Sequence, residues 1–410
     1  MLDVLPPDSG RWIDVISRFA VRAERFGYGL IVTPVVEHYE VFERVGEQTD
    51  VVSKEMYAFE DRGGRRLALR PEGTASVVRA YVQHRPVTPW KVWYVAPNFR
   101  AEAPQAGRYR QHWQLGAEAL GVDDPGVDVE MISLLYGFYA DLGLQDVALS
   151  LNSLGDAETR ERYRGVLLDY WRGHASVLGK ELERAEANPM RILDSKREDW
   201  ADVIEKAPQI VEYLSADSAA HFDAVQAGLR AIGIPFEISP RLVRGLDYYT
   251  NTVFEFASGA LAGAQNAIGG GGRYDGLAEQ MEGPSTPGIG FGSGIERLLI
   301  ACDAEGVLPV PGSALDAFVV DTVGGTEATL LLEELRTQGL AADRAYGGRS
   351  MKKQWAAADK SGARFGVLLA PRELEAGVVA VKDLATGTQT DVHRDEVAAW
   401  IRTKKDEQTQ

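Results

Sequence analysis

The sequence contains a single cysteine, Cys302, among 410 residues. One cysteine cannot form an intramolecular disulfide or a thiolate zinc cluster, and its scarcity suits a reducing cytoplasm. The six histidines never occur in the spacing H-x-x-x-H, so we expect no metal held by a dedicated protein site. No apolar run approaches the roughly 20 residues that cross a bilayer, and "MLDVLPPDSG" lacks the pattern of a secretory signal. These absences predict a cytoplasmic protein with no membrane partner.

Basic residues are also scarce, because 44 Lys and Arg face 60 Asp and Glu, a net charge of −16. This balance argues against broad, nonspecific binding of nucleic acid but leaves room for a local basic patch. The best candidate is the segment 344–364, where Ser350 is expected to be the N-cap of a helix. Its basic residues are Arg344, Arg349, Lys352, Lys353, Lys360 and Arg364.

Several common catalytic motifs are absent. There is no G-x-S-x-G, and "GGGGRYDG" at 269–276 lacks the Gly-Lys-Ser/Thr ending of a phosphate-binding loop. We expect its glycines to allow close approach of the backbone. In "RPEGT", Glu72 and Thr74 are predicted to share one face of a strand. The two side chains could bind an amine, or the segment could be merely the end of a strand.

The order of patterns predicts an α+β fold. A helix over 10–27 precedes strand-like segments that suit an antiparallel sheet, whereas 157–232 has helical spacing. Strands resume after 232 and end in "GIGFGSGIERLLIAC", a strand running into a helix; a Pro/Gly-marked linker follows. We therefore expect a discontinuous catalytic domain over 1–156 and 233–308, a mostly helical insertion over 157–232 and a C-terminal α/β domain over 314–405.

The segment "FRAEAPQAGRYRQHWQLGAE" at 99–118 concentrates arginines in this acidic chain. A strand over 110–118 places alternate residues on one polar face, which are Arg110, His112, Gln114, Gly116 and Glu118. Arginine presents a charged fork that matches phosphate oxygens, so the hairpin can hold a polyphosphate. Taken alone, an ordinary solvated hairpin is the stronger interpretation.

The ordered motifs together resemble the histidyl-tRNA synthetases, which are class II aminoacyl-tRNA synthetases. "FGYGLIVTPVVE" resembles class II motif 1, the segment from Asn98 to Glu118 motif 2, and "GIGFGSGIERLL" motif 3. "RLVRGLDYYTNTVFEF" at 241–256 and "GGGGRYDGL" at 269–277 are similar to stretches specific to the histidine enzymes. The resemblance implies an antiparallel class II catalytic domain with a helical insertion, followed by an anticodon-binding α/β domain.

The resemblance also implies the reaction and its partners. L-histidine and ATP would form histidyl-adenylate and pyrophosphate, with Mg²⁺ accompanying ATP, and histidine would pass to the 3′ end of tRNA(His). Arg100 would hold the α-phosphate and Arg297 the γ-phosphate side, while Arg244 would lie beside the reacting carboxylate. These three arginines would be catalytic, and motif 1 around Pro34 would build a homodimer.

The remaining implied sites fall into three groups. The nucleotide would be closed over by Glu102, Arg108 and Arg110. Histidine would be bound by Glu72, Thr74, Gln114, Glu118, Tyr248, Tyr249 and Tyr274. Transfer RNA would be bound by Arg349, Lys352 and Lys353. Core packing is an equally strong interpretation for Tyr248, and a solvated helix face remains an alternative for each lysine.

Two other functions stay open. A regulatory subunit of ATP phosphoribosyltransferase shares this fold without catalysis, but such a paralogue generally lacks the anticodon-binding domain and has eroded catalytic motifs. A different class II synthetase would need another amino acid site in place of "LVRGLDYY" and "GGRYDG".

Overall fold

The computed structural model describes residues 3–46, 54–102, 107, 109–187, 189–195, 197–243, 248–261, 266–311 and 315–407. The chain forms two compact units, Met1–Val4 with Arg11–Pro309, and Leu5–Gly10 with Val310–Gln410. In the described part of the chain, no helix has the length and apolar character needed to span a membrane.

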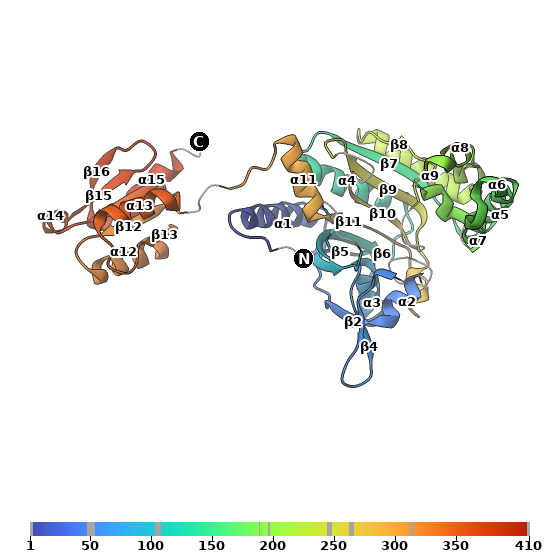
Figure 1. The fold of residues 1–410 in the computed structure, drawn as a ribbon, viewed down its shortest axis with the longest axis horizontal. Helices are drawn as coiled ribbons and strands as arrows, with labels where there is room; N and C mark the ends of the chain where they lie inside the picture. The colour runs from blue at the N-terminus through green and yellow to red at the C-terminus, as the bar shows by residue number, and fades with distance from the viewer. Residues whose placement is uncertain are drawn as a thin grey trace. The chain divides into compact units, whose positions relative to one another are not determined.

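An eight-stranded sheet forms the centre of the larger unit, in the order β1-β5-β6-β11-β10-β9-β7-β8 (Figure 1). At the two edges, β1 pairs in parallel with β5 and β8 pairs in parallel with β7. All the other pairs of this sheet are antiparallel, as the hairpin pattern predicts. The strands are β1 (Gly29–Leu30), β5 (Trp90–Phe99), β6 (Gln111–Leu120), β7 (Val147–Ser153), β8 (Glu237–Ile238), β9 (Thr250–Ser258), β10 (Ala267–Arg273) and β11 (Gly288–Gly294).

One face of this sheet packs on a helical layer. Val15, Phe19 and Ala23 recur at helical spacing along α1 (Asp8–Arg25) and are buried against the sheet. The layer also includes α4 (Pro125–Asp141), α9 (Ala216–Ala231) and α11 (Ile295–Glu305). Asp124 begins α4, because its carboxylate accepts from the Gly126 amide at 2.6 Å and Pro125 occupies the first turn. The predicted strand-to-helix passage is confirmed at β11 and α11.

The opposite face of the sheet carries the candidate site. It packs on α2 (Tyr39–Gly46) and α3 (Thr74–His84). The hydrophobic core between this face and the two helices continues into the helical segment that follows residue 156. A small antiparallel sheet, β2-β4-β3, lies beside them and consists of β2 (Val36–His38), β3 (Ala58–Glu60) and β4 (Arg66–Leu69). The short helix α10 (Leu277–Gln280) follows β10.

The segment from 157 to 231 is helical, as predicted, and its helices gather at one end of the larger unit in Figure 1. Asp156 caps the first of them by accepting from the Thr159 amide at 2.7 Å. The α-helices before α9 are α5 (Ala157–Gly173), α6 (Ala175–Leu178), α7 (Leu182–Ala187) and α8 (Ala201–Glu205). Short 3₁₀ turns connect them at η2 (Gly179–Glu181), η3 (Pro189–Asp194), η4 (Glu198–Trp200) and η5 (Ile210–Tyr213).

The second unit has the predicted alternation of strands and helices. Its sheet runs β13-β12-β14-β15-β16, with parallel pairs around β12 and antiparallel pairs beyond β14. The strands are β12 (Ala317–Asp321), β13 (Ala342–Arg344), β14 (Phe365–Leu369), β15 (Val378–Asp383) and β16 (Gln389–His393). The helices are α12 (Gly325–Thr337), α13 (Met351–Ser361), α14 (Pro371–Glu375), η6 (Arg394–Glu396) and α15 (Val397–Asp406). The α+β fold class inferred from the sequence is confirmed.

Candidate active site

The candidate site rests on a strip of backbone without side chains. In β11, glycine occupies every second position, 288, 290, 292 and 294, while Ile289 and Phe291 pack into the core on the other face. Gly290 lies opposite Glu118 of β6. A Cβ atom at Gly290 would lie 1.6 Å from Glu118 Oε2, so the carboxyl group extends across the strip. The glycines make room for functional side chains.

Glu118 is the centre of the site. It is completely buried, and three hydroxyl groups surround its carboxyl group. Thr74 Oγ1 donates to Oε1 at 2.8 Å, Tyr94 Oη donates to Oε1 at 3.3 Å and Tyr274 Oη donates to Oε2 at 2.7 Å. We use the name Glu118 cluster for one set of residues, Glu72, Thr74, Tyr94, Glu118, Tyr248, Tyr249 and Tyr274.

The environment of Glu118 changes its proton affinity. Burial raises the pKa of the carboxyl group to about 8, and the charge of Glu72 acts in the same direction. The hydrogen bonds from Tyr274, Thr74 and Tyr94 oppose this shift by favouring the charged form. A strongly perturbed carboxyl group among hydroxyl groups is typical of a ligand-binding or catalytic site.

The structure corrects the expectation that Glu72 and Thr74 share one face of a strand. Thr74 begins α3, and Glu72 lies in the turn before it. The Glu72 carboxylate accepts from the Thr74 amide at 2.6 Å and the Ala75 amide at 2.8 Å. The prediction was wrong because "PEG" ends the strand and a carboxylate can satisfy the first amides of a helix. Burial raises the pKa of Glu72, although these amides and the charge of Arg100 lower it.

The tyrosines come from three separate strands or strand ends. Tyr248 and Tyr249 precede β9, their ring centroids are 4.7 Å apart, and the Tyr248 ring meets the Tyr274 ring edge-on at 5.9 Å. The sequence analysis missed Tyr94, whose ring fits against Gly116 and Gly73. No pattern in the sequence identifies Tyr94, because its position opposite Gly116 depends on the register between β5 and β6.

Gln114 lies further along the same strand face. Its side chain lies over Gly292, and Asn98 Nδ2 donates to Gln114 Oε1 at 2.6 Å. Asn98 is completely buried, and the sequence analysis did not identify it. The bond leaves the Gln114 amide nitrogen available as a donor, so a carboxylate is a suitable ligand there.

Two of the predicted phosphate-binding arginines lie toward the same end of the sheet. Arg100 follows β5, is half-buried and donates through Nε to the Pro71 carbonyl at 3.0 Å. Arg297 lies in the first turn of α11, which begins after Gly294, the residue opposite Gln114. Its Nη1 donates to the Ala267 carbonyl at 2.9 Å.

The remaining predicted ATP contacts are placed differently. Glu102 is half-buried, and Arg110 is exposed immediately before β6. Gly107 packs against the Arg297 side chain, since its Cβ would lie 2.7 Å from Arg297 Cγ. The motif 2 connection therefore reaches the motif 3 helix. Arg108 and Arg244 lie outside the described residues.

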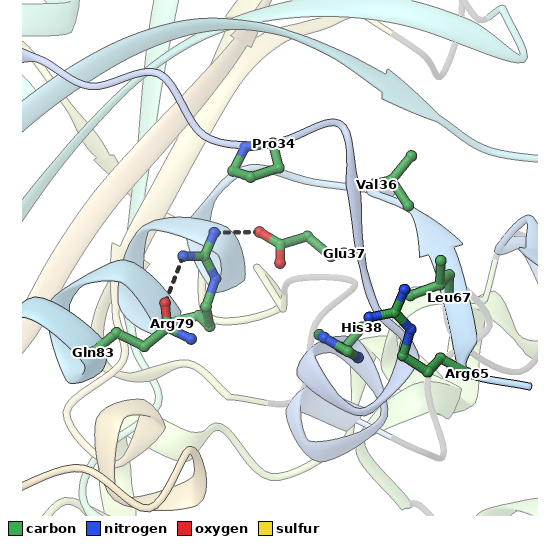
Figure 2. A pocket seen from close by; sticks show the side chains of 8 residues that line it. All are labelled: Pro34, Val36, Glu37, His38, Arg65, Leu67, Arg79 and Gln83. Carbon is green, nitrogen blue, oxygen red and sulfur yellow. Dashed lines mark hydrogen bonds and ion pairs between the residues drawn. The ribbon is translucent and has the colours of Figure 1, made fainter. Parts of the chain in front are cut away.

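A separate pocket lies beside Pro34, away from the Glu118 cluster. Figure 2 shows Arg79 of α3 reaching toward Glu37 and Gln83 within it. Arg79 Nη2 donates to Glu37 at 2.5 Å and Nη1 donates to Gln83 at 3.1 Å. The pocket is lined by Pro34, Val36, Glu37, His38, Arg65, Leu67, Arg79 and Gln83.

In the second unit, the predicted tRNA-binding residues are exposed together. Arg349 precedes α13, and Lys352 and Lys353 lie in its first turn. Ser350 occupies the N-cap position as predicted, but its side chain makes no capping hydrogen bond.

Comparison with known proteins agrees with this geometry. The family model for histidyl-tRNA synthetase matches residues 1–298, and the model for an anticodon binding domain matches residues 317–404. The chain belongs to the histidyl-tRNA synthetase family. It is accordingly an aminoacyl-tRNA synthetase, a member of an ATP-dependent family of ligases.

Relatives of this family match along the whole chain. A histidine–tRNA ligase of Rhodococcus erythropolis is 47% identical over 402 residues, which cover 96% of this chain and 94% of that protein. A histidine–tRNA ligase of Geobacillus kaustophilus is 48% identical over 410 residues, covering 97% and 96%. The apo histidyl-tRNA synthetase of S. aureus superposes with a TM-score of 0.83 at 36% identity and covers 98% of both chains. These matches favour a ligase over the regulatory-subunit alternative.

Proposed function

We propose that this chain activates L-histidine with ATP, giving histidyl-adenylate and pyrophosphate, and then transfers histidine to the 3′ end of tRNA(His). The observation that carries the proposal is the Glu118 cluster, a buried carboxyl group under three hydroxyl groups. It lies on the sheet face whose end carries Arg100 and Arg297.

The Glu118 cluster suits an imidazole ring. Glu118 would contact one ring nitrogen, and the Tyr249 hydroxyl group would contact the other. A site that pairs both nitrogens rejects analogues that leave its buried polar groups unpaired. Tyr248 and Tyr274 would line the ring, and Glu72, Thr74 and Gln114 would hold the ammonium and carboxylate of the amino acid.

The first chemical step requires positioning rather than a side-chain base. An oxygen of the histidine carboxylate attacks the α-phosphorus of ATP, and the bond to the bridging oxygen breaks as pyrophosphate leaves. Arg100 would stabilise charge on the α-phosphate, Arg297 would hold the γ-phosphate side, and Arg244 would lie beside the reacting groups. Glu102, Arg108 and Arg110 would close over the nucleotide.

Mg²⁺ would enter with ATP. Among the described residues, no three histidine, cysteine, aspartate or glutamate side chains converge on a metal position, so the phosphates would supply most of its ligands. When bound, the ion neutralises charge that develops on the phosphate oxygens. The proposed location is the cytoplasm, where tRNA is charged.

In the second step, tRNA would contact both the catalytic domain, through its 3′ end, and the C-terminal domain, through its anticodon arm. A hydroxyl group of the terminal ribose attacks the adenylate carbonyl, and AMP leaves. Arg349, Lys352 and Lys353 would contact phosphates of the anticodon arm, because exposed cations contribute the sequence-independent part of RNA binding. The proposed domains keep the predicted limits, 1–156 with 233–308, 157–232, and 314–405.

A homodimer through motif 1 is part of the proposal. Large apolar side chains are unusually exposed around Pro34, with exposed fractions of 58% for Leu30, 85% for Val32 and 42% for Val36. Phe59 of the neighbouring small sheet is also exposed. A second copy would cover this surface, since contiguous exposed apolar surface typically marks an interface.

The test is pyrophosphate exchange into ATP with each of the twenty amino acids. We expect exchange with histidine alone, without tRNA, and charging of tRNA(His) when it is added. Exchange driven by another amino acid, or none with histidine, would overturn the proposed function.

A further inference from the structure

A buried ion pair lies directly beside the Glu118 cluster and belongs to none of the proposed substrate contacts. Arg273, the last residue of β10, and Asp128 of α4 are both completely buried. Arg273 Nη2 lies 2.7 Å from Asp128 Oδ2, and Arg273 Nε donates to the same oxygen at 2.9 Å. Burial opposes the charged form of both groups, but hydrogen bonds from His221, at 3.2 Å, and from Arg273, together with the Arg273 charge, lower the pKa of Asp128. The charge of Asp128 likewise raises the pKa of Arg273.

The guanidinium group of Arg273 is fully engaged within the protein. Its Nη2 also donates to the Asp124 carbonyl at 2.9 Å, and its Nη1 donates to the Val122 carbonyl and to Asp275 Oδ1, each at 3.3 Å. All three nitrogens therefore have acceptors, so Arg273 is not placed to bind a phosphate or a carboxylate ligand. Its partners instead join the start of α4 to the end of β10.

Buried ion pairs often add little stability, because desolvation offsets their attraction. Their best-supported effect is to fix the arrangement of the groups around them. The residues next to Arg273 therefore show which groups this ion pair fixes. The next residue, Tyr274, donates to Glu118 at 2.7 Å. The residue after it, Asp275, accepts from Arg273, from the Gly288 amide at 3.2 Å and from Thr250 Oγ1 at 3.0 Å.

Tyr274 is thus held on both sides. Its amide donates to the Gly288 carbonyl at 2.8 Å, and its ring covers Gly288, where a Cβ would lie 2.3 Å from the ring. These contacts leave the ring one direction, toward Glu118. A shift of the chain at Arg273 would move the hydroxyl group away from the carboxyl group.

We propose that Arg273, held by Asp128, is a positioning residue for histidine recognition, which keeps the Tyr274 hydroxyl group on Glu118. This inference rests on the proposed function of the Glu118 cluster. It assigns to the buried pair an effect on histidine binding that acts through Tyr274 and leaves ATP binding unchanged.

The experiment measures KM for histidine, KM for ATP and kcat in pyrophosphate exchange, together with thermal unfolding. Asp128→Asn is expected to raise KM for histidine about tenfold or more, with KM for ATP within about twofold of wild type. Asp141→Asn is the matched control, because Asp141 lies on the same helix and pairs with Arg22 at 2.6 Å. It is expected to leave both KM values unchanged.

A double-mutant cycle with Tyr274→Phe separates positioning from general destabilisation. If Asp128 acts through Tyr274, Asp128→Asn adds little to KM for histidine once the hydroxyl group is absent. Multiplicative effects in the double mutant, or a lower melting temperature with unchanged KM for histidine, would overturn the inference. Arg273→Lys, which keeps the positive charge, is a second variant for use if Asp128→Asn fails to fold. It is also expected to raise KM for histidine and to leave KM for ATP unchanged.

The wild-type enzyme distinguishes the two levels of failure. If it shows no histidine-dependent exchange, the proposed function fails. If it exchanges normally and Asp128→Asn has an unchanged KM for histidine, only the positioning role fails.

Discussion

The Tyr274 hydroxyl group donates to Glu118 Oε2 at 2.7 Å, which joins the end of β10 to β6 across the glycine-lined β11. The two residues are 156 positions apart in the chain. Their contact completes the set of three hydroxyl groups around this completely buried carboxyl group.

Glu118→Gln is expected to raise KM for histidine about tenfold to a hundredfold and to leave KM for ATP nearly unchanged. Glutamine keeps the size of the side chain but replaces an acceptor with an amide donor opposite hydroxyl groups and the imidazole. Pyrophosphate exchange at varied histidine and fixed ATP measures the change. Equal increases in both KM values would instead indicate a general disturbance of the sheet.

Glu118 should also make stability depend on pH. Its pKa is raised from 4.5 to about 8, so between these values the folded protein keeps a proton that the unfolded chain has lost. The associated stability is fully present below pH 4.5 and is lost as pH rises through about 8. The free energy of unfolding of wild type, relative to Glu118→Gln, should therefore fall by an amount on the order of a few kcal/mol across this window.

Denaturant unfolding of both proteins at several pH values measures this difference. Using the difference cancels the titration of other buried carboxyl groups, such as Glu296, whose pKa burial raises to about 7. A difference that is constant with pH would contradict the raised pKa of Glu118.

Gly290→Ala is expected to abolish histidine-dependent exchange or raise KM for histidine more than a hundredfold. The added Cβ would lie 1.6 Å from Glu118 Oε2 and 2.8 Å from the Ala117 carbonyl, so the carboxyl group must move. Gly294→Ala is a control on the same strand, because no described atom lies within 4 Å of its Cβ position. The control should keep KM for histidine and the melting temperature near wild type; a similar loss in both variants would mean that β11 tolerates no side chain.

Val32→Asp is expected to convert the proposed dimer to a monomer at micromolar concentration. Val32 is 85% exposed on the apolar surface near Pro34, and a buried, unpaired carboxylate at an interface would oppose association. Light scattering coupled to size exclusion gives the mass. Val177→Asp, at an exposed apolar position in α6, should leave the mass unchanged. A monomeric wild type would contradict the dimer itself.

Lys352→Glu combined with Lys353→Glu is expected to raise KM for tRNA about tenfold or more, while pyrophosphate exchange without tRNA stays at the wild-type rate. The salt dependence of tRNA binding should weaken by about one unit of slope for each phosphate contact removed. Lys404→Glu is the control, because Lys404 is in the same unit and pairs with Glu407 at 2.7 Å. Unchanged tRNA binding in the double variant would assign the lysines to a solvated helix face.

The sequence alone determined the α+β class, the mostly helical stretch after residue 156 and the side of β6 on which Gln114 and Glu118 lie. Period two in a strand and 3.6 in a helix are local properties that can be seen in the sequence. Resemblance of whole motifs added the family and most residues of the Glu118 cluster, because those motifs keep their order along the chain.

Only the tertiary structure decided how these residues meet. Tyr94, Asn98 and the Arg273–Asp128 pair have no local pattern that separates them from ordinary core residues, and their roles depend on sheet register and on α4 reaching β10. Glu72 was misplaced because a short-range pattern cannot show that α3 begins at Thr74. The raised pKa of Glu118 likewise requires complete burial beside other polar groups, a property of the folded core that neighbouring residues in the sequence do not encode.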